Sequence, residues 1–320
     1  MELSSSSPVP ARPPLPPGLV LLVGVAAMSY AGPLVRFSSA PALIIAAWRL
    51  TFSVALIALV LSFRPAAWRG VRLSAREWLQ AGAAGLLLAA HFWSWIASLD
   101  LTTVSSSVVL VSTQPIFVAL FSTLFLHERA TALQWLGILI AVAGAVVIGW
   151  GDFGRGSTAL AGDLLATAGA VFVSGYYVIG RNLRKKLDLW LYIGIVYGVA
   201  AAAFIGLAAL HPGAALTGYP ARDWLIFAAL AAGPMMLGHT GVNYALRYLR
   251  AYIANLALLG EPIGATMIAW LLPAIHEVPG PQTVAGAILI LGGIALGVAR
   301  SGRSAHDRGD RRHGHDVPDA

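Results

Sequence analysis

Ten apolar stretches dominate this sequence and limit what it can fold into. They cover residues 19–37, 42–62, 77–99, 102–126, 131–150, 161–180, 188–210, 223–247, 251–274 and 280–300. Each is close to the roughly 20 residues that a helix needs to cross a bilayer. The runs are continuous and do not alternate apolar with polar residues, which excludes a transmembrane β-barrel. The sequence therefore predicts an all-α polytopic membrane protein with ten transmembrane helices.

The composition supports this class and excludes others. Charged residues make up 11% of the chain, against about 25% in a soluble domain, and the mean hydropathy is +0.76. These values exclude a soluble enzyme, a disordered protein and a coiled coil. With no cysteine, the chain has no disulfide framework and no thiolate metal site. The polar segments 1–17 and 301–320 are expected to be disordered tails.

Basic residues predict the orientation of the chain. If both termini face the cytoplasm, 17 of the 21 Lys and Arg residues lie on the cytoplasmic side of the ten spans. Basic residues beside span ends concentrate on that side of a membrane. We therefore expect a multi-pass protein of a bacterial inner membrane with both termini inside, and the net charge of +7 does not indicate nucleic-acid binding.

The chain repeats itself after five spans. Residues 91–97 (HFWSWIA) match 239–245 (HTGVNYA) at an offset of 148, and 114–116 (QPI) match 261–263 (EPI) at 147. The pairs 127–128 and 276–277, both His-Glu, are offset by 149. We assign a first repeat to residues 18–150 and a second to 151–300.

Because five is odd, the second repeat crosses the membrane upside down relative to the first. Inverted repeats around a central cavity are typical of secondary transporters, in which substrate binds near the midplane of the bilayer. A duplicated bundle that serves only as a scaffold is the weaker alternative.

Several of these motifs also resemble a known family, the EamA-type transporters of the drug/metabolite transporter superfamily. The segments that carry the resemblance are 97–107, Pro115, 126–128 and Gly137 in the first half, and 243–249, 261–262, 276–277 and Gly286 in the second. The resemblance implies ten helices, cytoplasmic termini and a central cavity open to one side at a time. It implies transport of small metabolites, and the general character is similar to the branch that exports aromatic amino acids. One departure is that His127 and His276 stand where the family often has glycine.

Two charged residues inside spans are candidates for the site, because ionisable groups within a membrane are costly and commonly functional. Arg49 lies about 11 Å from the outer end of span 2 by helical rise; it either contacts substrate or anchors the structure. Glu261 lies near the middle of span 9, where proton coupling, capture of a substrate amine, or a purely structural role are the alternatives. The two differ in depth by about 9 Å, so pairing between them needs a tilt or a long reach.

Prolines mark two predicted helix breaks of the kind that form transporter binding sites. Pro262 follows Glu261, and Pro115 follows Gln114 at the equivalent position of the first repeat. One half thus offers a titratable group and the other an amide of similar shape.

A symmetric pair of histidines completes the predicted cavity. His91 shares a helical face with Trp95, and His239 shares one with Asn243, because each pair is separated by four residues. Structural histidines are the alternative. Tyr30, Tyr176 and Tyr177 are further candidates for the cavity wall.

Small residues at every fourth position, such as Gly137 and Ala141 in span 5 and Gly293 and Gly297 in span 10, permit close helix packing. Packing inside the bundle is favoured, and a homodimer interface is the alternative to a monomer. The sequence lacks a phosphate-binding loop and the motifs of membrane metalloproteases and serine hydrolases. We expect no cofactor, no metal site and no enzyme activity, with proton coupling left open.

The resulting prediction is a secondary transporter that exports amino acids, including aromatic ones, or similar small metabolites by alternating access. Its predicted partners are a small-molecule substrate and the lipid bilayer. Nucleobases, sugars or hydrophobic drugs are alternative substrates, and facilitated diffusion is an alternative mode.

Overall fold

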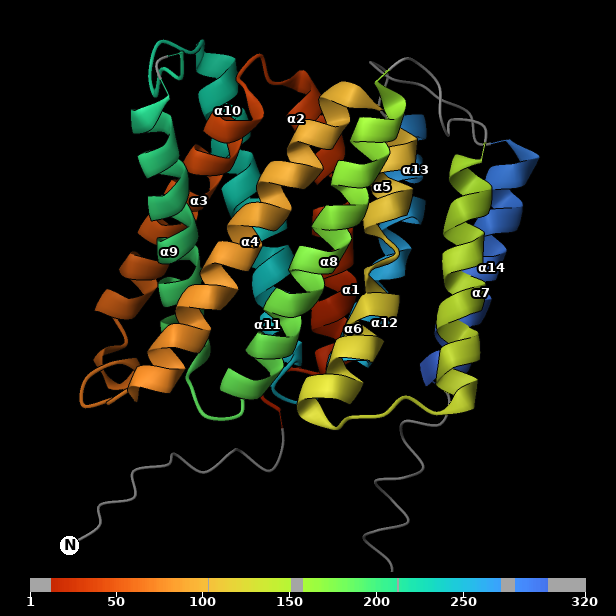
Figure 1. The fold of residues 1–320 in the computed structure, drawn as a ribbon, viewed down its shortest axis with the longest axis horizontal. Helices are drawn as coiled ribbons and strands as arrows, with labels where there is room; N and C mark the ends of the chain where they lie inside the picture. The colour runs from red at the N-terminus through yellow and green to blue at the C-terminus, as the bar shows by residue number, and fades with distance from the viewer. Residues whose placement is uncertain (1–12, 103, 151–157, 212, 272–279, 299–320) are drawn as a thin grey trace, which may run out of the picture.

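The computed structural model describes residues 13–102, 104–150, 158–211, 213–271 and 280–298. Every element in these ranges is a helix (Figure 1). In chain order they are α1 (Pro17–Met28), α2 (Ala31–Phe37), α3 (Ala42–Ser62), η1 (Pro65–Ala67), α4 (Ala75–Leu101), α5 (Val104–Val111), α6 (Gln114–Phe121), η2 (Ser122–Leu126), α7 (Ala132–Gly149), α8 (Ala159–Leu183), α9 (Leu189–Leu210), α10 (Ala221–Leu230), η3 (Ala231–His239), α11 (Thr240–Ala245), α12 (Ala251–Ala257), η4 (Leu258–Gly260), α13 (Glu261–Leu271) and α14 (Pro281–Val298).

The helices reproduce the ten predicted spans. Seven helical segments are long and apolar enough to cross a membrane, and α7 and α14 add two shorter apolar helices. The run from α12 through η4 to α13 supplies the tenth. The predicted fold class, an all-helical multi-span membrane protein, is confirmed. The predicted disorder of the tails falls almost wholly on residues outside the described ranges, and the pair His276-Glu277 lies outside them as well.

Local sequence explains where several spans begin. At the start of α4 the Ser74 hydroxyl accepts a hydrogen bond from the Glu77 backbone N–H at 3.3 Å, and the Glu77 carboxylate accepts from the Ser74 N–H at 2.9 Å. Thr131 and Gln134 form the same reciprocal pair at the start of α7. Such capping boxes satisfy backbone donors that a helix N-terminus leaves without partners.

Four spans are interrupted rather than continuous. In spans 4 and 9 the second half-helix begins at Gln114 and at Glu261, with Pro115 or Pro262 in its first turn. Proline is tolerated there because the first-turn N–H groups have no partner within the helix. In span 8 the helix widens to a π-helix, η3, which contains Pro234. Span 1 breaks between α1 and α2.

The packing of the helices has the pattern of a two-fold repeat. The helix α3 packs on α9, α7 packs on α14, and α4 packs on α8, while α1 packs on η3 and α11. If spans 1–5 are exchanged with spans 6–10, the first two contacts map onto themselves and the third maps onto the fourth. The start of α1 and the end of α14 lie on the same side of the molecule, as an even number of crossings requires (Figure 1).

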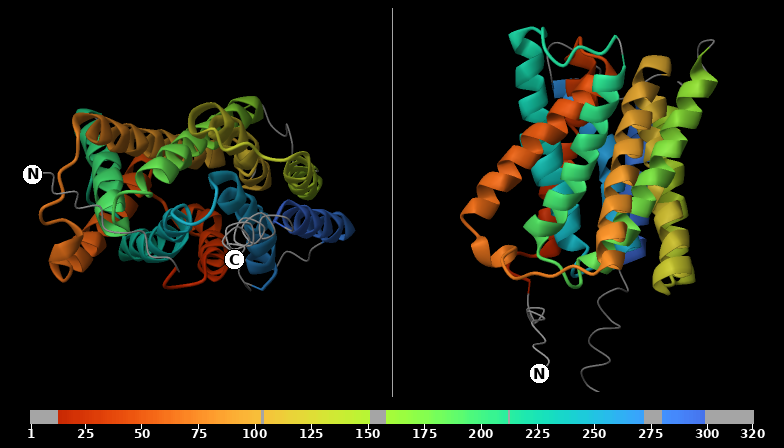
Figure 2. Two further views of the ribbon diagram at one scale, coloured as in Figure 1. Left: turned by 90° about the horizontal axis from the view of Figure 1, so that it is seen from below. Right: turned by 60° about the vertical axis from the view of Figure 1, so that its left-hand side comes forward.

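Glycines bring α7 and α14 into direct backbone contact. A Cβ atom placed on Gly137 would lie 2.7 Å from the Gly293 carbonyl oxygen, and one on Gly144 would lie 2.6 Å from that of Gly286. The two helices form a pair at one edge of the bundle (Figure 2). The small residues of spans 5 and 10 are therefore used within the chain, as the packing interpretation predicts.

Candidate substrate cavity

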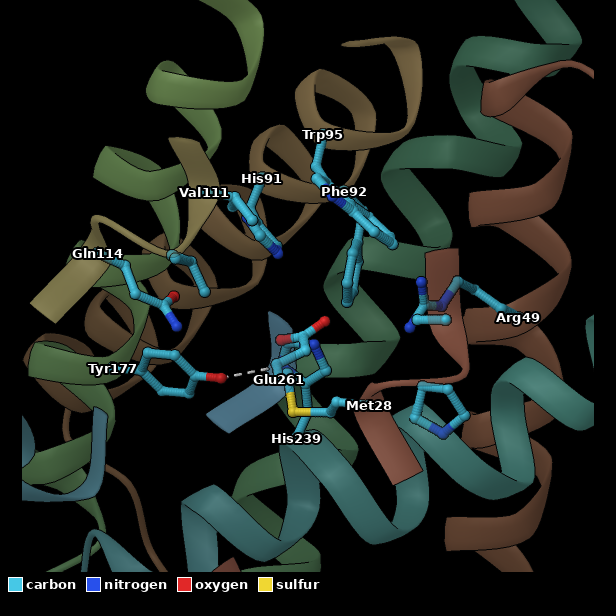
Figure 3. A pocket seen from close by; sticks show the side chains of 13 residues that line it. Met28, Arg49, His91, Phe92, Trp95, Val111, Gln114, Tyr177, His239 and Glu261 are labelled. Atoms are coloured by element: carbon cyan, nitrogen blue, oxygen red, sulfur yellow. Dashed lines mark hydrogen bonds between the residues drawn. The ribbon is translucent and has the colours of Figure 1, made fainter. Parts of the chain in front are cut away.

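A cavity lies between the two halves, where the interrupted spans meet. Its volume is about 30 Å³, room for one or two water molecules. Figure 3 shows that the side chains around it come from both halves of the chain. The polar or ionisable side chains lining it are Arg49, His91, Gln114, Tyr177, His239 and Glu261.

Arg49 enters the cavity from α3, and among the described residues no ion pair of 4.0 Å or less engages it. Only 1% of its surface is exposed, and its guanidinium carbon lies 4.2 Å from the centre of the Phe92 ring. Within the part of the chain that the structure describes, its Nε and Nη1 atoms are buried and have no hydrogen-bond partner. Burying donors without partners costs free energy, and the cost is larger for a charged group. A hydrogen-bond acceptor that entered the cavity would remove this cost.

Glu261 enters the cavity from the first turn of α13. It lines the same space as Arg49 (Figure 3), but among the described residues no ion pair of 4.0 Å or less joins the two. Gln114 occupies the corresponding first turn of α6. Helix N-termini carry a partial positive charge, so two of them converge on the cavity together with the guanidinium.

The two predicted histidines meet in the cavity. Their ring centres are 6.1 Å apart. The Nδ1 atom of His91 lies 2.9 Å from the Gly169 carbonyl oxygen; because a carbonyl only accepts, Nδ1 carries the proton. The Nδ1 atom of His239 lies 3.2 Å from the Tyr177 hydroxyl, the contact drawn in Figure 3.

Aromatic rings form much of the wall. Trp95 stacks parallel to His91 with 6.5 Å between ring centres, and Phe92 meets the His239 ring edge-on at 5.1 Å. The Trp95 indole N–H is buried and has no hydrogen-bond partner within the described ranges. The wall thus combines flat apolar surfaces with donors that lack acceptors.

Three residues predicted for the cavity lie elsewhere: Asn243, Tyr176 and Tyr30. Asn243 is fully buried behind the wall, where its amide donates to the Tyr176 hydroxyl and, at 2.7 Å, to the His239 carbonyl; it supports the position of His239. Tyr30 lies at the break between α1 and α2 with 48% of its surface exposed, and it is not among the residues lining this cavity. The break turns its side chain away from the bundle interior.

Phe92, Met28 and Pro234 line the cavity but were not predicted from the sequence. Each is an apolar residue in an apolar span, so composition gives no signal for it. The adjacency of Phe92 to His91 was the one available hint. No group of three or more His, Asp or Glu residues that could hold a metal ion occurs among the described residues.

Ion pairs between the two halves close one end of the bundle. Glu128, after η2, accepts from the Arg181 guanidinium at 3.0 Å and pairs with Lys185 at 3.5 Å. Arg181 also donates to the Leu246 carbonyl at 2.7 Å. Lys186 pairs with Glu77 at 3.3 Å at the same end.

Hydrogen bonds between the halves join the opposite end. Asp223, fully buried at the start of α10, accepts from the backbone N–H of Ser39 at 3.1 Å and from its hydroxyl. Thr102 donates to Asp163 at 2.9 Å. Contacts between the two halves therefore lie on both sides of the small cavity.

A helical membrane bundle with two related halves and a polar cavity between them is typical of membrane transport proteins. Comparison with known proteins identifies the family. Residues 16–150 and 160–298 each match the EamA-like transporter family, so the chain belongs to it, within the drug/metabolite transporter superfamily. The family consists of transporters and not enzymes, as the sequence predicted.

Individual relatives agree with this assignment. An uncharacterized transporter, YdfC, of Bacillus subtilis is 27% identical over 210 residues, which cover 64% of this chain and 66% of the relative. Solute carrier family 35 member F6 of Rattus norvegicus is 37% identical over 99 residues, 29% of this chain and 27% of that protein. The chain therefore spans about two thirds of the first relative and about a quarter of the second. One crystal structure has the same fold, with a TM-score of 0.73 at 21% identity over 89% of this chain and 98% of that one.

Proposed function

We propose that this protein exports amino acids, including aromatic ones, across a bacterial inner membrane by alternating access. The observation that carries the proposal is the pair of opposite charges in one cavity. An α-amino acid presents a carboxylate and an ammonium group on neighbouring atoms. Arg49 has buried N–H groups without acceptors, and Glu261 lines the same space, so the cavity offers a partner for each group.

The remaining wall suits a side chain with a flat apolar surface. Phe92, Trp95 and Tyr177 line the cavity together with the two imidazoles. Aromatic rings favour offset-stacked and edge-on contacts with one another. An aromatic amino acid would satisfy the charged groups and the rings together, whereas a sugar would leave Arg49 without a counter-charge.

The cavity must enlarge before such a substrate can bind. Its volume of about 30 Å³ is far below the roughly 300 Å³ at which small-molecule sites begin. On this proposal the structure represents a contracted conformation, which must open before substrate can bind. The interruptions at Gln114 and Glu261 are the points at which half-helices can move apart.

Glu261 also offers a route to proton coupling. It lines the cavity together with Arg49 without an ion pair, so a proton and a substrate ammonium can compete for its carboxylate. Export would then be driven by exchange of substrate for a proton. A facilitator would use the same site and show no response to a pH gradient.

The test is uptake of labelled phenylalanine into liposomes that contain the purified full chain, with and without an imposed pH gradient. We expect saturable uptake that the gradient changes and that other aromatic amino acids compete against. Glu261→Gln should abolish the response to the gradient. Asp100→Asn, an exposed carboxylate at the end of α4, is the matched control and should behave as the natural chain.

Other results would separate the alternatives. Uptake that ignores the gradient would identify a facilitator. Competition by nucleobases or sugars but not by amino acids would overturn the assignment of substrate. No saturable uptake of any of these solutes would overturn export as the function.

A further inference from the structure

A second hollow lies on the outside of the bundle, apart from the central cavity. It has a volume of about 640 Å³, within the range of about 300–1,000 Å³ that small-molecule sites occupy. It is bounded by α1, by the start of α9 and by η3 with α11, which pack against one another. We call it the α1–α9–α11 crevice.

The wall of this crevice is apolar and faces the membrane. Leu19 and Val23 on α1 are 54% and 46% exposed, and Leu237 on η3 is 51% exposed. From Leu19 to Val23 the crevice follows α1 for about 6 Å by helical rise, and Pro14 and Leu15, which precede the helix, extend it. Because these side chains point outward in a segment long enough to cross a membrane, the crevice is open sideways to lipid.

Positive charge gathers at one end of the crevice. Arg64, Arg184 and Arg247 line it, with Asp188 as the single acidic residue, a formal charge of +2. The Asp188 carboxylate is already engaged, since it accepts from the Trp190 backbone N–H at 2.8 Å. The Arg247 Nε atom is buried and has no hydrogen-bond partner within the described ranges.

We propose that the α1–α9–α11 crevice binds one anionic phospholipid. The phosphate lies against Arg247 and Arg64, and an acyl chain lies along Leu19, Val23 and Leu237. The charged end lies on the side where basic residues predict the cytoplasm, and that leaflet carries anionic lipids that attract basic residues. Trp190 and Tyr248 flank the same end, as amphipathic rings do at the headgroup level of a bilayer.

The roles of the arginines differ. Arg184 is 2% exposed, and it donates from Nε to the Asn243 carbonyl at 3.1 Å and from Nη1 to the Leu187 carbonyl. It belongs to the frame of the site. Arg64 is exposed and Arg247 is half-buried with its Nε atom unpaired, so these two can be changed without removing a contact between helices that the structure shows.

The experiment is native mass spectrometry of the purified full chain, titrated with phosphatidylglycerol or with phosphatidylcholine of the same acyl chains. We expect one phosphatidylglycerol molecule to bind in preference to phosphatidylcholine. The double variant R64Q/R247Q should weaken phosphatidylglycerol binding by about fivefold for each arginine removed. The double variant R72Q/R76Q removes two exposed arginines before and at the start of α4, outside the crevice, and it should bind as the natural chain does.

Three results would overturn the proposal. Equal binding of the two lipids would show that the arginines do not recognise the headgroup. An equal loss in R72Q/R76Q would show a diffuse effect of surface charge. Displacement of the lipid by glycerol phosphate at the same concentration would show a soluble phosphate site, with no part for the apolar wall. Thermal unfolding of each variant checks that a loss of binding is not a loss of fold.

Discussion

Arg49 is costly for the stability of the fold and well suited to binding a carboxylate. Its guanidinium is 1% exposed, and two of its nitrogens have no partner within the described chain. An unpaired buried charge destabilises a folded protein. Contact with Phe92 offsets only part of that cost, since a cation–π contact is worth about 0.5–2 kcal/mol. Binding a carboxylate would satisfy the donors, so the residue suits recognition better than it suits stability.

We therefore predict that Arg49→Gln separates transport from stability. Uptake of a labelled aromatic amino acid should fall about a hundredfold, as loss of about 3 kcal/mol of charge-assisted hydrogen bonding implies. The melting temperature of the solubilised protein should stay the same or rise. The control is Arg36→Gln, at an exposed arginine at the end of α2, which should change neither. A large drop in melting temperature for Arg49→Gln would instead identify a structural anchor.

His127 is the one described non-glycine residue with positive φ, at +56°. It ends η2 in the left-handed region, which costs an L-residue roughly 1–2 kcal/mol. Glycine, which the resemblance leads us to expect at this place, does not carry this cost. Ordering a glycine costs about 0.5–1 kcal/mol more conformational entropy. This entropic cost is smaller than, or about equal to, the cost of the left-handed conformation, so the difference favours glycine slightly.

His127→Gly should accordingly leave the stability of the protein unchanged or raise it by up to about 1.5 kcal/mol. Thermal unfolding monitored by tryptophan fluorescence measures this. The matched control is His211→Gly at the end of α9, where φ is −96°. Glycine there brings its entropic cost and removes the hydrogen bond that His211 Nδ1 accepts from the Gly213 backbone N–H at 3.3 Å, so the melting temperature should fall. A fall of equal size in both variants would argue against strain at His127.

At this scale the sequence predicts charged site residues better than apolar ones. Arg49, His91, His239 and Glu261 attract attention because ionisable groups are rare in spans, and the structure brings all four to one cavity. Phe92 carries no such signal. Tyr30 was expected in the wall, and its exposure depends on a break in span 1. Pro33, in the first turn of α2, marks that break, but it was not among the prolines from which helix breaks were predicted.

Among the elements, α7 and α14 show the tightest dependence on side-chain size. Gly144→Ala would place a Cβ atom 2.6 Å from the Gly286 carbonyl oxygen, closer than any relaxed contact, so the helices must separate. We predict that this variant lowers the melting temperature. Gly198→Ala in α9 is the control, because a Cβ atom there meets nothing within 4 Å. Alanine favours the helix by about 1 kcal/mol over glycine, so the control should hold or gain stability; equal stability of both variants would mean that the α7–α14 contact is loose.

Element boundaries were predictable where proline or a cap marks them. The half-helices that begin at Gln114 and Glu261 follow from Pro115 and Pro262, whose rings cannot sit in a helix interior without loss of a hydrogen bond. The π-helix η3 could not be predicted from the sequence in the same way, although Pro234 lies in it. A proline permits a kink, a break or a wider turn, and packing of η3 against α1 and α3 decides among them.

For the whole molecule, orientation is a prediction that the absence of cysteine from the sequence makes easy to test. Single cysteines can be placed at exposed sites on opposite sides, Ala66→Cys in η1 and Ala221→Cys at the start of α10. Because basic residues concentrate on the cytoplasmic side, a membrane-impermeant maleimide should label Ala221→Cys in intact spheroplasts. It should label Ala66→Cys only after permeabilisation. Labelling of Ala66→Cys and not of Ala221→Cys in intact spheroplasts would mean that the orientation is the opposite of the predicted one.

The internal repeat made the architecture accessible from sequence, because matching motifs at offsets near 148 imply two related halves. The volume of the cavity was not accessible in the same way. It depends on how far the halves have closed, and the closing contacts join residues distant in the chain, such as Glu128 to Arg181 and Asp223 to Ser39. Neither pair forms a local motif.

These contacts give the two ends of the molecule different electrostatic characters. The described ion pairs gather at the end predicted to be cytoplasmic, where Glu128 joins the first half to Arg181 and Lys185 of the second. Glu128 and Arg181 are 14% and 12% exposed, so water screens this pair only in part. Charge-assisted bonds of this kind contribute about 1.5–3 kcal/mol. Its loss should favour the state open at that end.

Ala31 lines the cavity, so a single cysteine placed there, Ala31→Cys, reports access to it. Glu128→Gln is expected to raise the labelling rate of this cysteine by about tenfold or more when reagent is added from the predicted cytoplasmic side. Lys186→Gln is the control. It breaks a pair whose lysine is 71% exposed, and exposed pairs are worth little, so labelling should change less than about twofold. An unchanged rate in Glu128→Gln would mean that closure of this end rests on helix packing. If the labelling rate rose only with reagent added from the opposite side, the Glu128–Arg181 pair would join the halves without controlling access from the predicted cytoplasmic side.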